Sequence, residues 1–544
     1  MDLGAGWSLS PDELLAGIRF VRRLSAYLRR PWHPQEAQAA LARRLKHRES
    51  GFLGIVRRCI YRNRSSPYRK LLDRAGCEYG DIARSVARDG IEDTLAQLYK
   101  AGVFLTVEEF KGRQPVVRGS ATLSLSPERF RNPLSMMHVA MKSGGSRSQG
   151  TPVVFDLDFI KDCALNTGLA LHMRGGDGWL KSTWEVPGGG ALFSLLEFSK
   201  FGLPPARWFS QLDPDRKELD PRYRWINRAL KWGASLAGIP MPPPQYVPLE
   251  DPTPIVRWLS GFLKEGKTPY LLTYPSCALR VCQTALDAGI DLEGAHITIA
   301  GEPCTQRRLD IIRSTGATVF PKYAIMETGP VGYGCLAPEA SDDIHLMSDL
   351  HAVIRAGERD ENGLPPGSLL FTSLMPSAPI VLLNVSMGDQ ADLVRRSCNC
   401  PLAKLGWDLH LHSIQSFEKL TCGGMSFMDS DIVRILDEVL PARFGGGPTD
   451  YQVVEGEEVS GDPMLTLIAR PRLGTLDERE VIQAFIQGVS HGGGANAVMG
   501  MAWTAGRRVR LERREPMATG SGKILHLHAK TRGTPAGHAE SGKS

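Results

Sequence analysis

Small and hydroxyl-bearing residues gather at positions 143–152, which read Ser-Gly-Gly-Ser-Arg-Ser-Gln-Gly-Thr-Pro. Glycines let backbone N–H groups approach a ligand closely and serines add further donors, so such a loop can wrap the oxygens of a phosphate group. Thr151 stands where the lysine of a Walker motif would be, which excludes a P-loop nucleotide hydrolase. The segment predicts a phosphate-binding loop of another kind, and an exposed loop without a ligand is the alternative.

Three thiols and one imidazole have the composition of a tetrahedral zinc site. Cys398 and Cys400 form a close pair, and Cys335 and His345 lie upstream on either side of an acidic loop. Three thiolates and one imidazole would complete a closed site. Cysteines that only fill apolar space are the alternative, because a C-x-C pair is weaker evidence than C-x-x-C. The spacing alone leaves both interpretations open.

A third motif, Gly488-Val-Ser-His-Gly492, matches the G-x-S-x-G pattern of serine hydrolases. That chemistry requires the serine on a tight turn after a strand and before a helix. A helical pattern precedes the motif here, and only about fifty residues follow it for an acid and a histidine. The sequence therefore predicts against a serine hydrolase.

The elements that must position these residues alternate between strands and helices. Apolar runs of strand length occupy 270–274, 296–300 and 318–320, and 306–313 has the pattern of a helix. A strand, a helix and a second strand in this order predict a βαβ unit within an α/β fold.

The two ends of the chain differ from the middle. The pattern from about residue 10 to 76 predicts helices rich in arginine, whose charges we expect on a solvated face, with an acidic ligand as the alternative. Toward the other end the pattern predicts a small α+β domain with helices at 428–440 and 476–486 and strands at 464–469 and 509–515. The expected organisation is a helical extension (1–60), a large domain (61–417), a small mobile domain (418–530) and a disordered tail (531–544).

Composition limits the classes of partner and location. The chain has 544 residues, with Lys+Arg 65 and Asp+Glu 59, so the formal net charge is 65 − 59 = +6. This small imbalance gives no reason to expect nucleic acid, and no run approaches the roughly 18 apolar residues of a membrane helix, so we expect no membrane partner. Cys 10 is too dilute for a disulfide scaffold, which together with the acidic first residues favours a cytoplasmic location.

Five short segments, in order, resemble the adenylate-forming superfamily and its phenylacetate–CoA ligase-like branch. They are Tyr61-Arg-Asn-Arg-Ser-Ser-Pro-Tyr-Arg-Lys-Leu-Leu-Asp-Arg-Ala-Gly76, Ala300-Gly-Glu-Pro303, Tyr323-Ala-Ile-Met-Glu-Thr-Gly329, Gly388-Asp389 and Pro516-Met-Ala-Thr-Gly-Ser-Gly-Lys-Ile524. The resemblance spans roughly residues 61–530. It implies an α/β fold in which a large N-terminal adenylate-forming domain with βαβ sheets is followed by a small mobile α+β C-terminal domain.

The resemblance also implies roles for individual residues. The loop would cradle the phosphates of ATP through Ser143, Gly144, Gly145, Ser146 and Gly150. Gly301, Glu302 and Pro303 would flank the adenine and Tyr323 would pack against it. Asp389 would accept hydrogen bonds from the ribose, Glu327 would hold Mg²⁺, and Lys523 would bridge the carboxylate and the α-phosphate. Some members of this branch also resemble zinc-bearing proteins, with a cysteine, a histidine and a Cys-x-Cys pair in the same order along the chain as Cys335, His345, Cys398 and Cys400. The resemblance therefore implies a structural zinc ion on these four residues.

The implied activity is that of an ATP-dependent carboxylic-acid ligase. It would form an acyl adenylate from a small acid, of the aryl or arylacetic class, and then an acyl thioester and AMP with coenzyme A, with a homodimer as the expected assembly. Met326 stands where a threonine is usual and Val385-Ser386 replace a Tyr-Arg pair, so two alternatives stay open. One is transfer of the acyl group to a carrier protein, a cysteine or an amine, even without ATP. The other is a nucleotide-binding scaffold protein.

Overall fold

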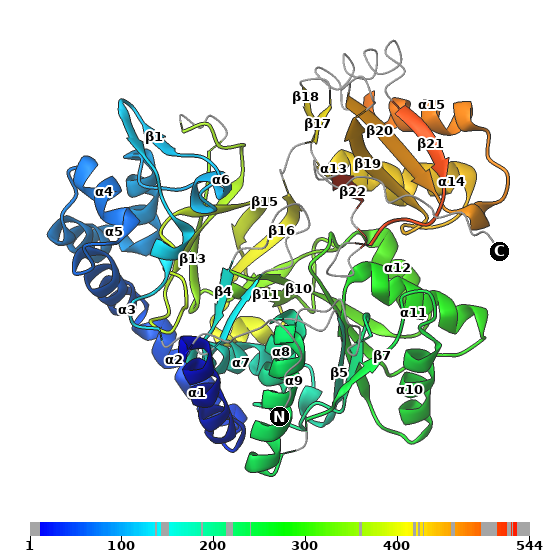
Figure 1. Ribbon diagram of the computed structural model, residues 1–544, viewed down its shortest axis with the longest axis horizontal. Coiled ribbons are helices and arrows are strands. Elements are labelled where there is room, and N and C mark those ends of the chain that lie inside the picture. Colours follow the sequence, from blue (N-terminus) through cyan, green and yellow to red (C-terminus); the bar gives the residue numbers. More distant parts are fainter. Residues whose placement is uncertain are drawn as a thin grey trace. The chain divides into compact units, whose positions relative to one another are not determined.

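The structure is a computed structural model of the chain (Figure 1), and by contact it divides into two compact units at about residue 418. The residues whose structure is described are 11–135, 139–142, 152–185, 189–213, 221–239, 241–357, 362–416, 420–422, 425–427, 429–457, 463–490, 509–518, 524 and 526–529.

The larger unit is built on a twelve-stranded sheet, one half of which is parallel. In spatial order the parallel strands are β7 (Pro244–Tyr246), β6 (Arg207–Ser210), β5 (Leu180–Glu185), β8 (Pro269–Thr273), β9 (His296–Ala300) and β10 (Thr318–Ile325). The other half is antiparallel and continues through β11 (Gly329–Gly334), β12 (Ile344–Leu346), β16 (Leu409–Ser416), β15 (Val385–Arg395), β14 (Ser368–Ser373) and β13 (His351–Arg355). The direction changes at β10, which has a parallel and an antiparallel neighbour.

Helices cover both faces of the parallel half, and its central strands β8 and β9 are buried accordingly. Leu271 of β8 packs in one core with α10 (Thr253–Lys264), α11 (Pro275–Asp287) and α12 (Gln306–Arg313). Its neighbours Tyr270 and Leu272 pack in another core with α7 (Leu157–His172). Successive residues of a strand point to opposite faces, so both faces are buried. The predicted strands and the helix at 306–313 are confirmed.

The N-terminal helices pack against this unit. They are α1 (Pro11–Leu28), α2 (Pro34–Lys46), α3 (Arg48–Ile55), α4 (Pro67–Arg74) and α5 (Tyr79–Lys100), with one π-helical turn at Val56–Tyr61. Helices α3–α5 share a core with the antiparallel strands. Helix α2 contacts α7, and α1 contacts α9 (Pro221–Ala237), beside which it lies in Figure 1. The helical pattern predicted for the first part of the chain is confirmed.

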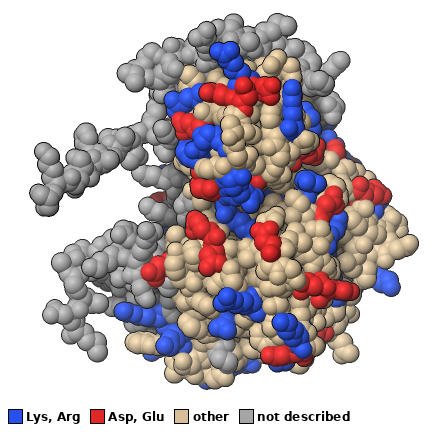
Figure 2. Space-filling view, turned by 90° about the vertical axis from the view of Figure 1, so that its right-hand side faces the viewer, with Lys and Arg blue, Asp and Glu red and all other residues tan. Residues whose placement is uncertain are grey.

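Shorter elements complete the larger unit. They are α6 (Val107–Phe110), α8 (Gly189–Phe198), and two small hairpins made of β1 (Val116–Arg118) with β2 (Ala121–Leu123) and of β3 (Val139–Lys142) with β4 (Pro152–Phe155). On the face that Figure 2 shows, basic and acidic side chains are interspersed. None of the described helices combines the length and the apolar character needed to cross a membrane.

The smaller unit has a four-stranded sheet in the order β21 (Val509–Arg513), β20 (Pro463–Ala469), β19 (Tyr451–Glu457) and β22 (Leu527–Ala529). Its core is closed by α13 (Asp429–Arg434), a π-helical turn (Ile435–Val439), α14 (Leu440–Phe444) and α15 (Glu478–Ser490). A separate hairpin joins β17 (Leu420–Cys422) to β18 (Met425–Phe427). The predicted helices and strands of this α+β unit are confirmed.

The first three residues of the G-x-S-x-G motif lie among the described residues of that unit and do not have hydrolase geometry. The serine of the motif, Ser490, is the last residue of α15, so a helix rather than a strand leads into it. A Cβ at Gly488 would stand 2.8 Å from Cγ1 of Ile435, so this glycine permits close packing of α15 against the π-helical turn. The structure agrees with the prediction against a serine hydrolase at this motif.

Candidate functional site

The segment Gly301–Pro303 begins at the carboxyl end of β9, the edge at which open α/β sheets bind ligands. Gly301 has φ 81, a left-handed conformation that suits glycine and turns the chain sharply away from the strand. Ala300 pairs with Lys322 of β10. The segment therefore lies beside the end of β10, where Tyr323 follows.

The carboxylate of Glu302 is turned inward and fully engaged. It accepts hydrogen bonds from the backbone N–H of Ser276 at 2.9 Å and from the Ser276 hydroxyl at 2.7 Å. Arg308 of α12 donates to it at 3.1 Å, and neither side chain of this ion pair is more than 1% exposed. Ser276 lies in the first turn of α11, where unsatisfied N–H groups attract an anion. The glutamate thus fixes the loop, and the surface left to a ligand is the loop's backbone.

Tyr323 and Asp389, 66 residues apart in the chain, are in direct contact. The Tyr323 hydroxyl donates a hydrogen bond to Oδ2 of Asp389 at 2.5 Å. Burial and the neighbouring carboxylate both raise the pKa of the Tyr323 hydroxyl well above its usual value, so it stays protonated and remains a donor. Asp389 follows Gly388, which has φ 93, within the long strand β15. The structure brings these two predicted residues together.

Glu327 lies in the turn between β10 and β11, four residues after Tyr323. It is only 8% exposed, and no other described residue forms an ion pair or a hydrogen bond with its side chain. A buried carboxylate is costly unless a cation or several donors compensate it. The position therefore suits a cation, and Met326 beside it offers no oxygen ligand.

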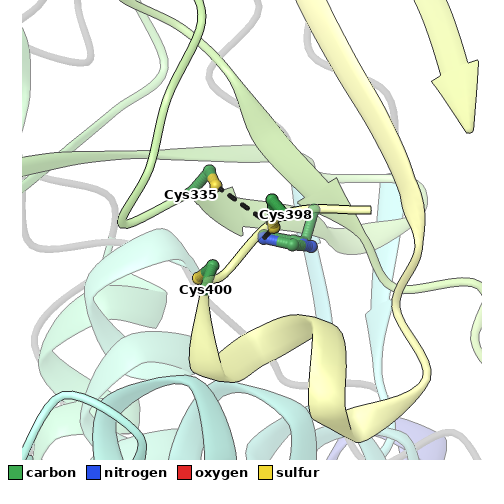
Figure 3. Close-up of side chains that lie close together, drawn as sticks. Cys335, Cys398 and Cys400 are labelled. Atoms are coloured by element: carbon green, nitrogen blue, oxygen red, sulfur yellow. Dashed lines mark hydrogen bonds between the residues drawn. The ribbon is translucent and has the colours of Figure 1, made fainter. Parts of the chain in front are cut away.

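The four predicted zinc ligands come together although they belong to separate loops and strands. Their candidate ligand atoms all lie within 4.8 Å of one another. Sγ of Cys335 is 3.8 Å from Sγ of Cys398, and Sγ of Cys398 is 3.6 Å from Nε2 of His345. A tetrahedral zinc ion would place two sulfurs about 3.8 Å apart and a sulfur and a nitrogen about 3.6 Å apart. Figure 3 shows the three labelled cysteines around one point.

Groups around this cluster hold its ligands in a suitable state. His345 donates a hydrogen bond from Nδ1 to the carbonyl of Trp407 at 2.7 Å. Nε2 is then unprotonated, and its lone pair is available on the side of Cys398. The backbone N–H groups of Leu336 and Ala337 each lie 3.3 Å from a sulfur, of Cys400 and Cys335 respectively. Such donors favour a thiolate over a thiol, and the pKa of the Cys400 thiol is lowered, first by its hydrogen bond with Cys335, whose own pKa is raised. The arrangement can bind a soft divalent cation such as zinc.

A second buried imidazole beside the cluster was not predicted. The ring of His410 contacts that of His345, with centroids 4.1 Å apart and the ring planes tilted by 50°, because the two residues pair directly across β16 and β12. Nδ1 of His410 donates to Asp343 at 2.8 Å, and Asp343 also pairs with Arg396. Only the strand pairing places His410 here, so no local signal in the sequence could have found it.

Arg44 of the N-terminal helices is only 15% exposed and lies in an ion-pair network, contrary to the solvated face expected for these residues. Arg44 of α2 donates to Oδ1 of Asp162 at 2.5 Å and to Oδ2 of Asp349 at 3.4 Å. Asp349 accepts a further bond from Nε1 of Trp407 at 3.2 Å, and the carbonyl of that tryptophan accepts from His345. Arg44 is therefore linked to the thiol cluster through two residues. The expectation was wrong for Arg44 because its acidic partners come from distant segments.

Two predicted groups lie outside the described residues. They are the phosphate loop, with Ser143, Gly144, Gly145, Ser146 and Gly150, and Lys523 near the end of the chain.

Comparison with known proteins gave structural neighbours only. No family model matches the chain, and no curated protein matches it. A solved 2-hydroxyisobutyryl-CoA ligase, in complex with 2-HIB-AMP and CoA, is similar at 13% identity and a TM-score of 0.43, covering 93% of this chain and 92% of its own. The amide bond synthetase McbA from Marinactinospora thermotolerans has 12% identity and a TM-score of 0.41, with 94% and 98% covered.

A third neighbour is the anthranilate CoA ligase AuaEII in complex with anthranoyl-AMP. It has 13% identity and a TM-score of 0.41, covering 76% of this chain and 69% of its own. Identities and TM-scores this low carry no argument about activity.

Proposed function

We propose that the chain is an ATP-dependent carboxylic-acid ligase. The observation that carries the proposal is the contact between Tyr323 and Asp389, at 2.5 Å, beside the fixed loop Gly301–Pro303. Three of the five segments that resemble the adenylate-forming superfamily contribute to this one edge of the sheet. The convergence of segments so distant in the chain supports one shared ligand, and an adenine nucleotide is what the resemblance implies.

Different described residues would contact different parts of the nucleotide. The backbone of Gly301–Pro303 would face the adenine, because the Glu302 carboxylate is already bonded to α11 and α12. Asp389, held in one orientation by the Tyr323 hydroxyl, would accept hydrogen bonds from the ribose. A carboxylate accepts strongly from hydroxyl groups, and fixing it beforehand lowers the entropy lost on binding.

Glu327 would bind Mg²⁺ beside the phosphates. Its carboxylate is buried and unpaired within the described part of the chain, which fits a residue whose partner is a bound cation. Mg²⁺ prefers oxygen ligands and is usually held by one or two carboxylates together with phosphate oxygens. When bound it would offset the charge of the phosphates and so ease attack by an anionic carboxylate.

The reaction would run in two steps. A carboxylate oxygen of the acid attacks the α-phosphorus and pyrophosphate leaves, which gives an acyl adenylate. A thiol, of coenzyme A in the first instance, then attacks the acyl carbon and AMP leaves. Lys523 would neutralise charge at the α-phosphate in the first step, and its compact ammonium on a flexible stem suits that role. The aryl or arylacetic class of acid and the role of Lys523 rest on the sequence resemblance.

The test is exchange of labelled pyrophosphate into ATP, measured with purified protein, Mg²⁺ and a panel of benzoic, arylacetic and medium-chain acids. Exchange that depends on one acid is expected, and Asp389→Asn should reduce it at least about tenfold because a carboxylate acceptor is replaced by an amide. Asp392→Asn, in the same strand and 44% exposed, is the matched control and should retain it. ATP binding without exchange for any acid would contradict the ligase and favour the scaffold alternative.

We further propose that Cys335, His345, Cys398 and Cys400 bind a structural zinc ion. The support is the match between their separations and a tetrahedral site, together with the fixed tautomer of His345. Purified protein should contain one equivalent of zinc by elemental analysis, and Cys398→Ser should lose it. Cys304→Ser, at a half-buried cysteine away from the cluster, is the matched control. Equal zinc content in both variants would refute the assignment.

A further inference from the structure

Helix α9 presents two large apolar side chains to solvent. Trp232 is 68% exposed and Leu236 is 61% exposed, the highest values among the exposed large hydrophobic side chains of the described residues. They are four positions apart, so they lie one above the other on the same side of the helix. Isolated exposed apolar residues need no explanation, but an adjacent tryptophan and leucine do.

The opposite side of α9 is packed tightly, so the exposed pair is not a consequence of a poorly packed helix. Leu230 and Ala234 are each 2% exposed. A Cβ at Gly233 would stand 2.5 Å from Cδ2 of Leu24, so α1 and α9 approach closely at this glycine. Helix α9 therefore has a defined inner face, and Trp232 and Leu236 belong to its outer face.

Basic side chains surround the exposed pair. Arg228 and Lys231 are exposed on α9, and the Arg29 guanidinium of α1 donates a hydrogen bond to the Leu236 carbonyl. The helix, Pro-Arg-Tyr-Arg-Trp-Ile-Asn-Arg-Ala-Leu-Lys-Trp-Gly-Ala-Ser-Leu-Ala, contains no acidic residue along its length. A partner for this surface must therefore accept a tryptophan and a leucine at its centre and be negatively charged around them.

We propose that the outer face of α9 binds the surface of an anionic lipid bilayer, a peripheral contact that departs from the expectation of no membrane partner, which rested on the lack of a membrane-spanning run. Tryptophan and leucine would enter the boundary between headgroups and acyl chains, while Arg228, Lys231 and Arg29 contact the lipid phosphates. A second copy of the chain fits less well, because a twofold interface on this face would oppose identical basic residues. An acidic protein would need a pocket for each protruding side chain, whereas a fluid bilayer adapts to both.

The experiment is co-sedimentation of the full chain with vesicles of phosphatidylcholine alone or with about a third of phosphatidylglycerol, a fraction that gives an anionic surface. Binding is expected only to the anionic vesicles and should weaken with salt. The double variant Trp232→Ala/Leu236→Ala should bind at least about tenfold more weakly. Leu286→Ala, at a leucine of α11 that is 41% exposed, is the matched control and should bind like the parent protein.

A second measurement separates insertion from simple charge attraction. Lipids brominated on their acyl chains should quench the tryptophan fluorescence of the parent protein more than that of the Trp232→Phe variant, because only an inserted indole approaches the bromine. Arg228→Glu/Lys231→Glu should abolish binding while leaving the fold intact, since both residues are exposed. The proposal is overturned by equal binding of the parent and the Trp232→Ala/Leu236→Ala variant. It is also overturned if that variant changes only the oligomeric state, or only the binding of an acidic protein.

Discussion

Replacing Arg44 by methionine tests whether the N-terminal helices stabilise the larger unit through charge. Methionine keeps most of the length of the arginine and removes four donated hydrogen bonds. These go to the backbone carbonyl of Asp162 at 3.1 Å, to its Oδ1 at 2.5 Å, to Asn166 at 3.3 Å and to Asp349 at 3.4 Å. Among the described residues no other cation pairs with these two carboxylates.

The magnitude follows from what each carboxylate retains. Asp349 has a fully buried side chain and keeps bonds from Asn166 at 2.7 Å and from Trp407 at 3.2 Å. Asp162 is 21% exposed and keeps its bond from Ser377 at 2.5 Å. Removing one partner of a buried ion pair typically costs about 3–5 kcal/mol. The retained bonds place Arg44→Met at the lower end, about 3 kcal/mol.

The loss should depend on pH in a defined direction. Burial raises the pKa of both Asp162 and Asp349, while attraction to Arg44 lowers it, so removing Arg44 raises both pKa values further. A carboxyl group whose pKa is higher in the folded state destabilises the fold increasingly as pH rises from its unfolded pKa through its folded pKa. The variant should therefore lose more stability at about pH 8 than at about pH 5.

The assay is urea unfolding of the full chain at both pH values, followed by tryptophan fluorescence. Arg43→Met, at the adjacent and exposed arginine, is the control and should change the free energy of unfolding by less than about 0.5 kcal/mol. Adding Asp349→Asn to Arg44→Met should recover part of the loss. A loss for Arg44→Met below about 1 kcal/mol, or one that is the same at both pH values, would refute the reasoning.

Three further outcomes are expected. Burial lowers the pKa of His351 to about 4. Keeping this histidine neutral therefore contributes up to about 3 kcal/mol to the free energy of unfolding above the unfolded-state pKa of about 6.5, and this contribution is lost as pH falls from about 6.5 to about 4. His351→Gln should flatten that part of the stability profile in urea titrations. Gly168→Ala should destabilise the larger unit by about 1–3 kcal/mol, because the new Cβ would stand 2.1 Å from the ring of Phe201; differential calorimetry would show no loss if the ring can move aside. Tyr323→Phe should raise the KM for ATP about tenfold with little change in kcat, since it releases Asp389 without removing it, and an unchanged KM would separate this contact from nucleotide binding.

Local patterns predicted the secondary structure well where the sequence of a segment alone determines whether it forms a helix or a strand. The helix Gln306–Arg313 and the strand His296–Ala300 have the bounds that were predicted, because each is a short amphipathic or apolar segment between clear breaks. The direction change at β10 was not predicted. Whether two strands pair parallel or antiparallel depends on the connection between them and on distant neighbours, and hydrophobic pattern carries little of that information.

Site residues divide in the same way. The four residues of the thiol cluster were predicted from composition and resemblance, and the structure brings them together. Neither the ring contact of His410 with His345 nor the ion pairs of Arg44 could be predicted, because both depend on partners more than fifty residues away. The orientation of Glu302 was also missed. The resemblance implied that Gly301–Pro303 flank the adenine, which stays a prediction, but it did not indicate that the Glu302 side chain is bonded to the helices behind the loop.

That orientation limits how any anionic ligand can lie on the sheet. The N-terminus of α11 carries a partial positive charge and would otherwise attract a phosphate group at the carboxyl end of β8. Glu302 occupies that position as an internal anion, with both of its oxygens on Ser276. The chain thereby excludes phosphate from one strand end by filling it with its own side chain. We therefore expect the charged part of any ligand to lie elsewhere along this edge of the sheet, away from the first turn of α11.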